Sequence, residues 1–343
     1  MKKENFDSLL EFVKRLPKTE THLHLEGSYP IELLKKYQLI FDEDGYRPPW
    51  MEPQFKFESF EQFLGLFARY SRPLFSSVER YYEAASGVLD TCSKQNVRYV
   101  ELSFHLSALS FSGLDGRAVT RAIRAAAPQG MELRVFAGLC RDAFHDPKTR
   151  KMVEAALEWD ELDGLDLHGP EELPLEPWTA EIWRRAREAG KVTKAHAGEL
   201  MPASFIWKVI EDLGVKRIEH GVRAVEDKKL IRFLVENEIA LDICPTSNVK
   251  LGVKGIPSMS AHPIRKLLDD GVICTLSTDD SLFFNNSINQ EYCALHTELG
   301  LTPLELARLA KNGFHVALVD DVKKHNFFSE VEAALSAYID CMA

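Results

Sequence analysis

The segment Thr21-His22-Leu23-His24-Leu25 places two imidazoles at alternate positions near the end of a short apolar run. Residues i and i+2 of a strand point the same way, so both rings are expected on one side of a sheet. Other apolar runs are also followed by acids or imidazoles, namely His196 and Glu199, then His220, then Asp279 and Asp280. Such groups converge when all strands end at one rim, as in a parallel (β/α)8 barrel.

Eight short apolar or β-branched runs can be counted in the 343 residues. They span about 20–25, 97–104, 133–141, 162–168, 191–197, 216–221, 239–245 and 272–278. Segments with helical spacing separate most of them, and this βαβα alternation indicates a parallel sheet. Because no second domain is evident, we predict an α/β fold: a single TIM barrel domain over residues 1–343.

Two segments depart from the alternation. Residues 27 to about 90 form a long insertion after the first strand, with helical pieces at 30–37, 57–70 and 78–93, and its place on the rim suggests a lid. We expect most of its phenylalanines to pack on the barrel and at least one to face a ligand; these are Phe55, Phe57, Phe60, Phe63 and Phe67. The segment 302–343 predicts two extra C-terminal helices that cover the outside or the bottom of the barrel.

The charge and the cysteines narrow the class of partner. The net charge is −10, and no basic run appears, which disfavours nucleic acid and anionic membranes. None of the six cysteines forms a C-x-x-C pair, and no signal-peptide core or membrane span is visible. We therefore predict a cytoplasmic enzyme with a small-molecule substrate, whose oligomeric state the sequence leaves open.

The paired imidazoles of His22 and His24 indicate a metal site, because two neutral rings side by side in a core need a common partner. His196 adds a third nitrogen and Asp279 an oxygen. Three imidazoles and one carboxylate suit Zn2+ with one position left for water, although Fe2+ or Co2+ could bind there. Such a metal lowers the pKa of its water to about 7, which gives a hydroxide nucleophile.

Three further side chains can act on that water or on a substrate. Asp279 and Asp280 are adjacent, so we predict that Asp279 binds the metal and that Asp280 orients the attacking water. His220 can hydrogen-bond the same water. Glu199 lies three residues beyond His196 and is expected to donate a proton to a substrate nitrogen.

The remaining histidines divide into two groups. His105 and His168 follow strands and are candidates for ligand contact. The others are predicted to lie on the surface or to cap helices, namely His145, His262, His296, His315 and His325. Lys194 is expected to point into the barrel and to pair with an acid such as Glu101.

The motifs resemble those of the adenosine deaminase family within the amidohydrolase superfamily. They are Thr21-His22-Leu23-His24-Leu25-Glu26-Gly27, Asp166-Leu167-His168-Gly169-Pro170-Glu171, His196-Ala197-Gly198-Glu199, Arg217-Ile218-Glu219-His220-Gly221, Cys244-Pro245-Thr246-Ser247-Asn248 and Ser277-Thr278-Asp279-Asp280. The resemblance implies one Zn2+ per chain on His22, His24, His196 and Asp279. It also implies hydrolytic deamination of a 6-aminopurine nucleoside or base to the 6-oxopurine and ammonia.

The resemblance further implies roles for individual residues. Glu199 would protonate the purine N1, while His220 and Asp280 would activate and orient the metal-bound hydroxide that attacks C6. Gly169 would offer its backbone N–H to N3, which suits a residue without a side chain.

Three positions depart from the family pattern and concern the substrate: Ser281 stands where Pro often follows the paired aspartates, and the other two are Glu26 and His168. Glu26 stands where members that read the ribose of adenosine carry Asp, and relatives acting on adenine or 6-aminodeoxyfutalosine carry Glu there. His168 stands where Ala is more usual. With Gly169, these two residues are the candidate substrate contacts. We predict adenosine or 6-aminodeoxyfutalosine as the substrate, with adenine as the alternative.

Other functions fit the motifs less well. Ester, amide or phosphoester hydrolases of the same superfamily often bind two metals through a carboxylated lysine after strand four, where this chain has Leu165-Asp166-Leu167-His168-Gly169. A non-catalytic scaffold would be expected to lack a ligand or the acid. The H-x-E and P-C-x-x-C signature of the nucleic-acid-editing zinc deaminases is missing.

Overall fold

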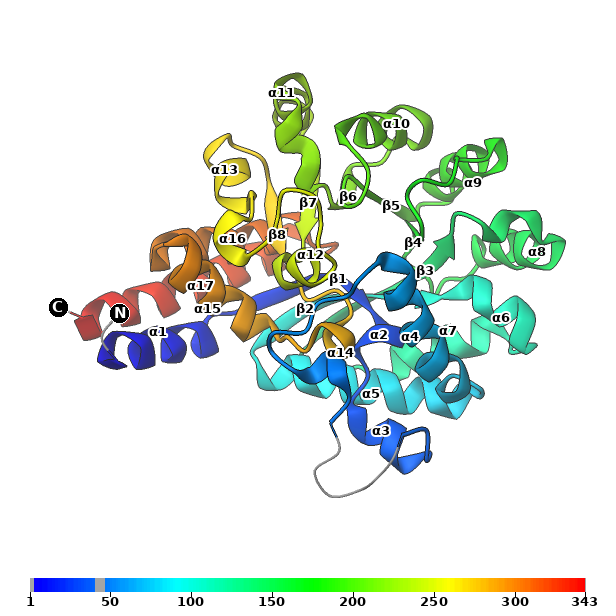
Figure 1. Ribbon diagram of the computed structural model, residues 1–343, viewed down its shortest axis with the longest axis horizontal. Helices are drawn as coiled ribbons and strands as arrows, with labels where there is room; N and C mark the ends of the chain where they lie inside the picture. Colours follow the sequence, from blue (N-terminus) through cyan, green and yellow to red (C-terminus); the bar gives the residue numbers. More distant parts are fainter. Residues whose placement is uncertain (1–2, 41–46, 343) are drawn as a thin grey trace.

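The computed structural model describes residues 3–40 and 47–342 of the chain. Eight strands form one parallel sheet in sequence order (Figure 1). The strands are β1 (Lys18–His24), β2 (Val97–His105), β3 (Glu132–Cys140), β4 (Gly164–His168), β5 (Val192–Ala197), β6 (Arg217–His220), β7 (Ala240–Ile243) and β8 (Cys274–Leu276). Each lies within or close to one of the eight predicted runs.

The sheet closes where the chain beyond β8 meets β1. The backbone N–H of Asp279 donates to the carbonyl of His22, and the N–H of His24 donates to the carbonyl of Asp279, both at 3.2 Å. The predicted TIM barrel is therefore confirmed. Asp279 has a φ of 66°, in the left-handed region, so the chain does not continue through it as a regular strand.

Helices that follow the strands in the chain cover the outside of the barrel (Figure 1). They are α5 (Val78–Lys94), α7 (Gly116–Ala125), α8 (Pro147–Ala156), α9 (Pro177–Glu188), α10 (Ala203–Leu213), α11 (Lys228–Glu236), α13 (Ile264–Asp269) and α16 (Pro303–Val316). Since α5 packs against β2 and α7, it is the ordinary crossover helix between β1 and β2. The expected insertion of 27–90 is therefore too long at its C-terminal end.

Shorter helices follow the strands at the rim or belong to the insertion. These are α2 (Leu25–Ser28), α3 (Ile31–Lys36), η1 (Pro49–Met51), α4 (Phe60–Leu74), α6 (Leu106–Ser112), η2 (Ala143–His145), η3 (Val222–Glu226), α12 (Pro245–Lys250), η4 (Met259–Ala261), α14 (Ser281–Phe284) and α15 (Ile288–Leu299).

An aromatic cluster joins the insertion to α14. The ring of Phe63 stacks on Phe284 at 5.3 Å between centroids, and Trp50 lies 5.5 Å from Phe283. Phe57 and Phe63 are both 5% exposed, so their predicted packing role is confirmed. That another phenylalanine of the insertion faces a ligand, and that the insertion acts as a lid, stay predictions.

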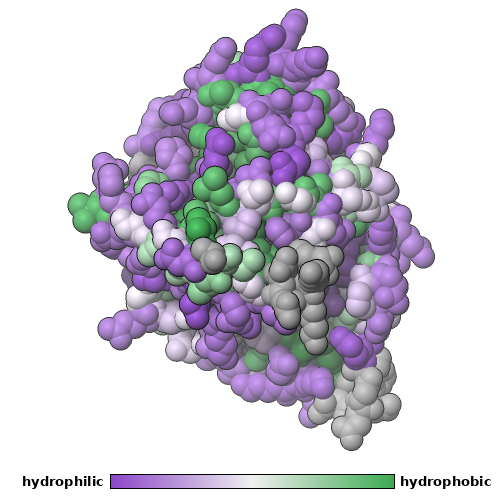
Figure 2. Space-filling model, turned by 90° about the vertical axis from the view of Figure 1, so that its left-hand side faces the viewer, coloured by the Kyte–Doolittle hydropathy of each residue, from purple (hydrophilic) through white to green (hydrophobic). Residues whose placement is uncertain are grey.

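The two ends of the chain lie next to each other. The N-terminal helix α1 (Lys3–Arg15) packs beside α17 (Asp321–Met342), which also covers α16 (Figure 1). The two predicted C-terminal helices are thus confirmed, and α16 is the barrel helix that packs on β8 and β1. Hydrophilic side chains predominate on the face in Figure 2, with hydrophobic ones scattered among them. Among the described residues, no helix combines the length and apolar character that a membrane crossing requires.

Candidate functional site

The four predicted metal ligands converge at the carboxyl ends of their strands. Nε2 of His196 lies 3.1 Å from Nε2 of His22 and 3.3 Å from Nε2 of His24. Oδ1 of Asp279 lies 3.6 Å from Nε2 of His22 and 3.4 Å from Nε2 of His24. A tetrahedral Zn2+ with bonds of about 2.0–2.1 Å needs ligand atoms about 3.3–3.4 Å apart, so this set fits the ion.

The protonation of the rings also favours a cation. Nδ1 of His22 lies 3.1 Å from the carbonyl oxygen of Asp242, and Nδ1 of His196 lies 3.0 Å from that of Leu167. Because a carbonyl oxygen only accepts, each Nδ1 carries a proton, and Nε2 of a neutral His22 ring presents a lone pair. Burial holds the pKa values of His22 and His24 well below their usual range, so both rings are neutral. The Nε2 lone pairs of these two neutral rings are suited to bind a cation.

Two buried carboxylates support His196 from behind. Its Nδ1 lies 2.9 Å from Oε2 of Glu219 and 3.3 Å from Oδ1 of Asp166. Burial alone would lower the pKa of His196, but Glu219 and Asp166 raise it well above the usual value. The same negative charge strengthens the ring as a metal ligand, because a carboxylate behind an imidazole makes its other nitrogen more basic.

Glu199 and His220 lie together beside the metal ligands. Oε2 of Glu199 is 3.5 Å from Nε2 of His220, which is 3.8 Å from Oδ2 of Asp279. Burial, together with Asp279 and Glu171, raises the pKa of Glu199 well above its usual value. A raised pKa favours the protonated form of Glu199, which the predicted role as proton donor requires.

Asn248 and His262 hold this acid in place. The side-chain amide of Asn248 donates to Oε1 of Glu199 at 3.3 Å and contacts Nδ1 of His220 at 3.2 Å. Nε2 of His262 lies 3.1 Å from Oδ1 of Asn248. The prediction that His262 lies on the surface is wrong, because the residue is only 3% exposed. The alternative capping role fits better, since Nδ1 of His262 accepts a hydrogen bond from the N–H of Ile264. Nothing in the spacing of the motifs indicated this contact.

Asp280 occupies a space that a glycine provides. A Cβ added to Gly27 would lie 1.6 Å from Oδ1 of Asp280. Among the described residues, that oxygen is buried without a hydrogen-bond partner. Burial, with the neighbouring Asp279, raises the pKa of Asp280 well above its usual value. An unsatisfied carboxyl beside the ligands is suited to bind a water or a substrate atom.

The loop after β5 is fixed by a carboxylate that the sequence prediction left without a role. Oε1 of Glu171 accepts from the N–H of Glu199 at 3.1 Å, and Oε2 accepts from Leu200 at 2.9 Å and from Met201 at 2.6 Å. Its position in the motif after β4 was visible in the sequence. The partner loop was not, because hydrogen bonds to backbone leave no mark on residue identity.

The three candidate substrate contacts lie on the side of β2 to β4. Oε1 of Glu26 accepts from the backbone N–H of His105 at 2.9 Å, and Tyr81 forms a further hydrogen bond with the carboxyl. His168 ends β4, and its ring centroid lies 5.7 Å from that of His24. Gly169 follows with a φ of 88°, which a residue with a side chain rarely adopts.

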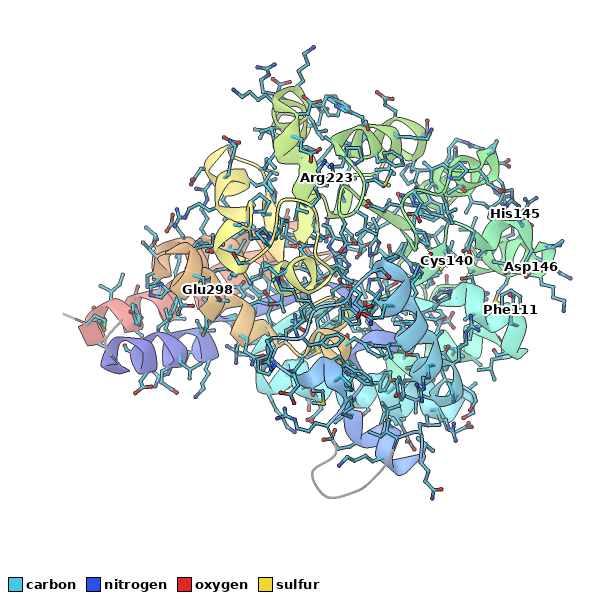
Figure 3. The ribbon with its side chains drawn as sticks, in the orientation of Figure 1. Phe111, Cys140, His145, Asp146, Arg223 and Glu298 are labelled. Atoms are coloured by element: carbon cyan, nitrogen blue, oxygen red, sulfur yellow. The ribbon has the colours of Figure 1, made fainter. Side chains whose placement is uncertain are left out.

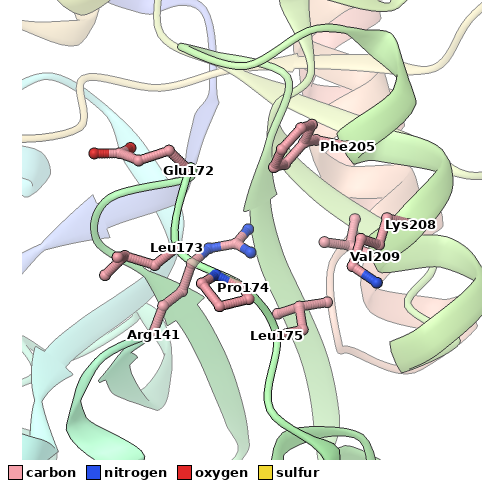
Figure 4. A pocket seen from close by; sticks show the side chains of 8 residues that line it. All are labelled: Arg141, Glu172, Leu173, Pro174, Leu175, Phe205, Lys208 and Val209. Carbon is pink, nitrogen blue, oxygen red and sulfur yellow. The ribbon is translucent and has the colours of Figure 1, made fainter.

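A separate cavity of about 200 Å³ lies between the loop after β4 and α10 (Figure 4). Its lining includes Arg141, Leu173, Phe205 and Val209, and none of the predicted site residues. Arg141 links the two regions, because its Nη2 donates to the backbone carbonyl of His196 at 2.8 Å. The predicted site residues therefore lie in the rim cluster and outside this cavity.

Known proteins share the sequence pattern and the fold of this chain. The chain matches the model of the adenosine deaminase family over residues 17–334. An adenine deaminase of Pseudomonas putida is 32% identical over 321 residues, covering 91% of this chain and all of that protein. The crystal structure of adenine deaminase from Arthrobacter aurescens has a TM-score of 0.81 at 24% identity, covering 94% of this chain and 99% of that one. A zinc-bound amidohydrolase structure from Burkholderia ambifaria also gives 0.81, at 23% identity, covering 97% and 94%.

Proposed function

Since this chain belongs to the adenosine deaminase family, we propose that the aminopurine it deaminates is free adenine, with one Zn2+ bound per chain. The products are then hypoxanthine and ammonia. This choice differs from the sequence-based preference for adenosine or 6-aminodeoxyfutalosine. Those two nucleosides become the comparison substrates.

The choice of adenine rests on the burial and the hydrogen bonds of Glu26. Its carboxylate is 5% exposed and is already bonded to the backbone of His105 and to Tyr81. The hydroxyl of Ser71 donates to its backbone carbonyl at 2.6 Å, so the residue is held from both ends. A carboxylate engaged in this way is poorly placed to read a ribose hydroxyl, which favours a substrate that ends at the purine. The relatives named adenine deaminase support the same choice.

The ligand set His22, His24, His196 and Asp279 would hold the zinc ion. When bound there, Zn2+ supplies a water acidic enough to attack at neutral pH. Glu199 binds and protonates N1 of the purine, which makes C6 more electrophilic. His220 and Asp280 orient the attacking water beside Asp279, and Oδ1 of Asp280, unpartnered among the described residues, accepts its proton.

Ammonia release by the zinc-loaded protein tests the substrate. The panel should contain adenine, adenosine, deoxyadenosine, methylthioadenosine, S-adenosylhomocysteine and 6-aminodeoxyfutalosine. We expect kcat/KM for adenine to exceed that for adenosine by at least about 100-fold. An enzyme discriminates to about this extent against a substrate whose extra group, here the ribose, it does not bind. A nucleoside as the best substrate would overturn the choice of adenine. In the same assay, Glu199→Gln should lower kcat by about 10²–10⁴ with an unchanged zinc content.

A further inference from the structure

A second cluster of metal-binding side chains lies on the rim beside the catalytic ligands. His105 ends β2, Cys140 ends β3 and His168 ends β4. Their donor atoms all lie within 4.8 Å of one another. Sγ of Cys140 is 3.6 Å from Nε2 of His105 and 4.0 Å from Nδ1 of His168. In the view of Figure 3, Cys140 lies nearer the middle of the molecule than Phe111, His145 and Asp146.

These distances are close to those that a metal would require. A tetrahedral Zn2+ with one sulfur at about 2.3 Å and nitrogens at about 2.0–2.1 Å separates sulfur from nitrogen by about 3.5 Å. The same distances are also within the range of hydrogen bonds to sulfur, in which the thiol proton serves one ring and an N–H of the other ring donates to Sγ. A bound cation would replace both of these contacts with metal–ligand bonds.

The surroundings leave room for an ion and favour positive charge. A Cβ on Gly138 would lie 2.8 Å from Nε2 of His168, so this glycine makes space for the ring. The other ring nitrogen, Nδ1, is the one that lies 4.0 Å from Sγ of Cys140. All three side chains remain partly exposed, so an ion can reach them from the rim. Asp142 and Asp166 add negative charge close to Cys140.

We propose that His105, Cys140 and His168 form a second site, for a thiophilic divalent cation such as Zn2+, distinct from the four-ligand catalytic site. Binding forms one metal–sulfur and two metal–nitrogen bonds, and the thiol proton of Cys140 passes to solvent. A water completes the four ligands. The cation displaces no catalytic ligand, because none of the three residues belongs to that set.

Occupation of this site has a consequence for activity. The His168 ring adjoins His24, and Gly169 is next in the chain, so the ion would stand at the side where the purine enters. Excess zinc is then a competitive inhibitor with respect to adenine. This consequence rests on the proposed function, whereas the binding itself does not.

Cobalt distinguishes the two sites, because only the second contains a thiolate. Metal-free protein should be titrated with Co2+ while its absorption spectrum is recorded. The wild type should bind about two ions per chain, and a near-ultraviolet thiolate-to-cobalt charge-transfer band should accompany one of them. Cys140→Ala should bind about one ion, lack the band and retain deaminase activity. Cys341→Ala, which removes an exposed thiol at the C-terminus, is the matched control and should keep the band.

Zinc inhibition supplies the second readout. Cys140→Ala should raise the zinc concentration for half-maximal inhibition by at least about tenfold, and Cys140→Ser should behave in the same way. A wild-type protein without the thiolate band, or a band that survives in Cys140→Ala, overturns the proposal. Failure of adenine turnover would overturn the proposed function instead, and the cobalt spectrum would still decide the second site.

Discussion

Gly27 shows how a residue without chemistry of its own can control the catalytic site. The space that its Cβ would fill is occupied by the carboxyl of Asp280. In Gly27→Ala we expect Asp280 to be pushed from its position, because the overlap with Oδ1 cannot be relieved without moving the side chain. The chain should still fold and bind zinc, since Asp280 is not one of the four ligands. We predict a loss of kcat of at least about 100-fold, the effect of a displacement of about 1 Å at a reacting group.

Gly65→Ala provides the matched control for this substitution. Gly65 lies in α4, and nothing would come within 4 Å of an added Cβ. The control should keep full activity and gain about 0.5–1 kcal/mol in the free energy of unfolding, because alanine is the better helix former. Steady-state kinetics with zinc analysis checks both variants. Wild-type kcat in Gly27→Ala would contradict the assigned position of Asp280.

At the scale of single residues, the sequence predicts side chains whose residue type itself indicates a chemical role. His22, His24, His196 and Asp279 could be predicted because several imidazoles and acids at strand ends rarely serve packing alone, and the structure brings them together. Lys194 also points into the barrel as predicted, 3.2 Å from Oε2 of Glu101. Supporting residues could not be predicted in this way. An asparagine, a core histidine or a glycine acquires its role only from neighbours distant in the chain.

At the scale of elements, the loop between β5 and α10 depends on Glu171. This carboxylate binds three successive backbone N–H groups, and Glu199 contributes the first of them. In Glu171→Gln the amide NH2 would face one of these donors, so the loop should shift together with the proton donor. We expect kcat/KM to fall about 10–100-fold, which is usual when a residue that orients a functional group from behind is lost.

Two measurements separate this positioning role from a general loss of folding. The zinc content should stay at the wild-type level, and kcat should fall more than KM rises, since the proton donor acts in the transition state. Glu172→Gln changes the adjacent exposed glutamate and should leave all parameters unchanged. A selective loss of zinc in Glu171→Gln would show that the carboxylate supports the metal rather than Glu199.

The order of strands and helices was the most predictable feature at this scale. Each strand is buried on both faces, so its apolar run stands out from the amphipathic helices around it. The boundary of the insertion was less predictable. The segment 78–93 reads as a helix in either role, and only its packing against β2 and α7 identifies it as a barrel helix.

At the scale of the whole molecule, a chain of buried charges crosses the barrel interior. Arg217 on β6 donates to Asp242 at 2.7 Å and to Glu101 at 3.2 Å. Glu101 also contacts Lys194, whose Nζ lies 2.8 Å from Glu219, the carboxylate behind the metal ligand His196. The metal site therefore rests on a polar core whose charges compensate one another.

Removing one member of this network should leave buried charge uncompensated. In Arg217→Met, the carboxylates of Glu101 and Asp242 both lose their guanidinium partner. We expect a loss of about 3–5 kcal/mol in the free energy of unfolding near neutral pH, the usual cost of breaking a buried ion pair on one side. Urea unfolding of the zinc-saturated proteins measures it. Arg232→Met, at an exposed position of α11, is the control and should stay within about 0.5 kcal/mol of wild type.

The pH dependence identifies the source of that loss. Burial alone would raise the pKa of Glu101, but Arg217 and Lys194 hold it below its usual value. In the wild type, ionised Glu101 makes its full contribution to the free energy of unfolding above the pKa of about 4.3 that it has in the unfolded chain. This contribution is lost as the pH falls through the lower pKa that Glu101 has in the folded protein. Without Arg217 the carboxyl takes up its proton at a higher pH, which relieves the uncompensated charge. The difference between wild type and Arg217→Met should therefore shrink as the pH is lowered from 8 towards 5, about where free carboxyls begin to titrate. A difference that stays constant over this range would assign the loss to packing of the arginine side chain instead of to charge.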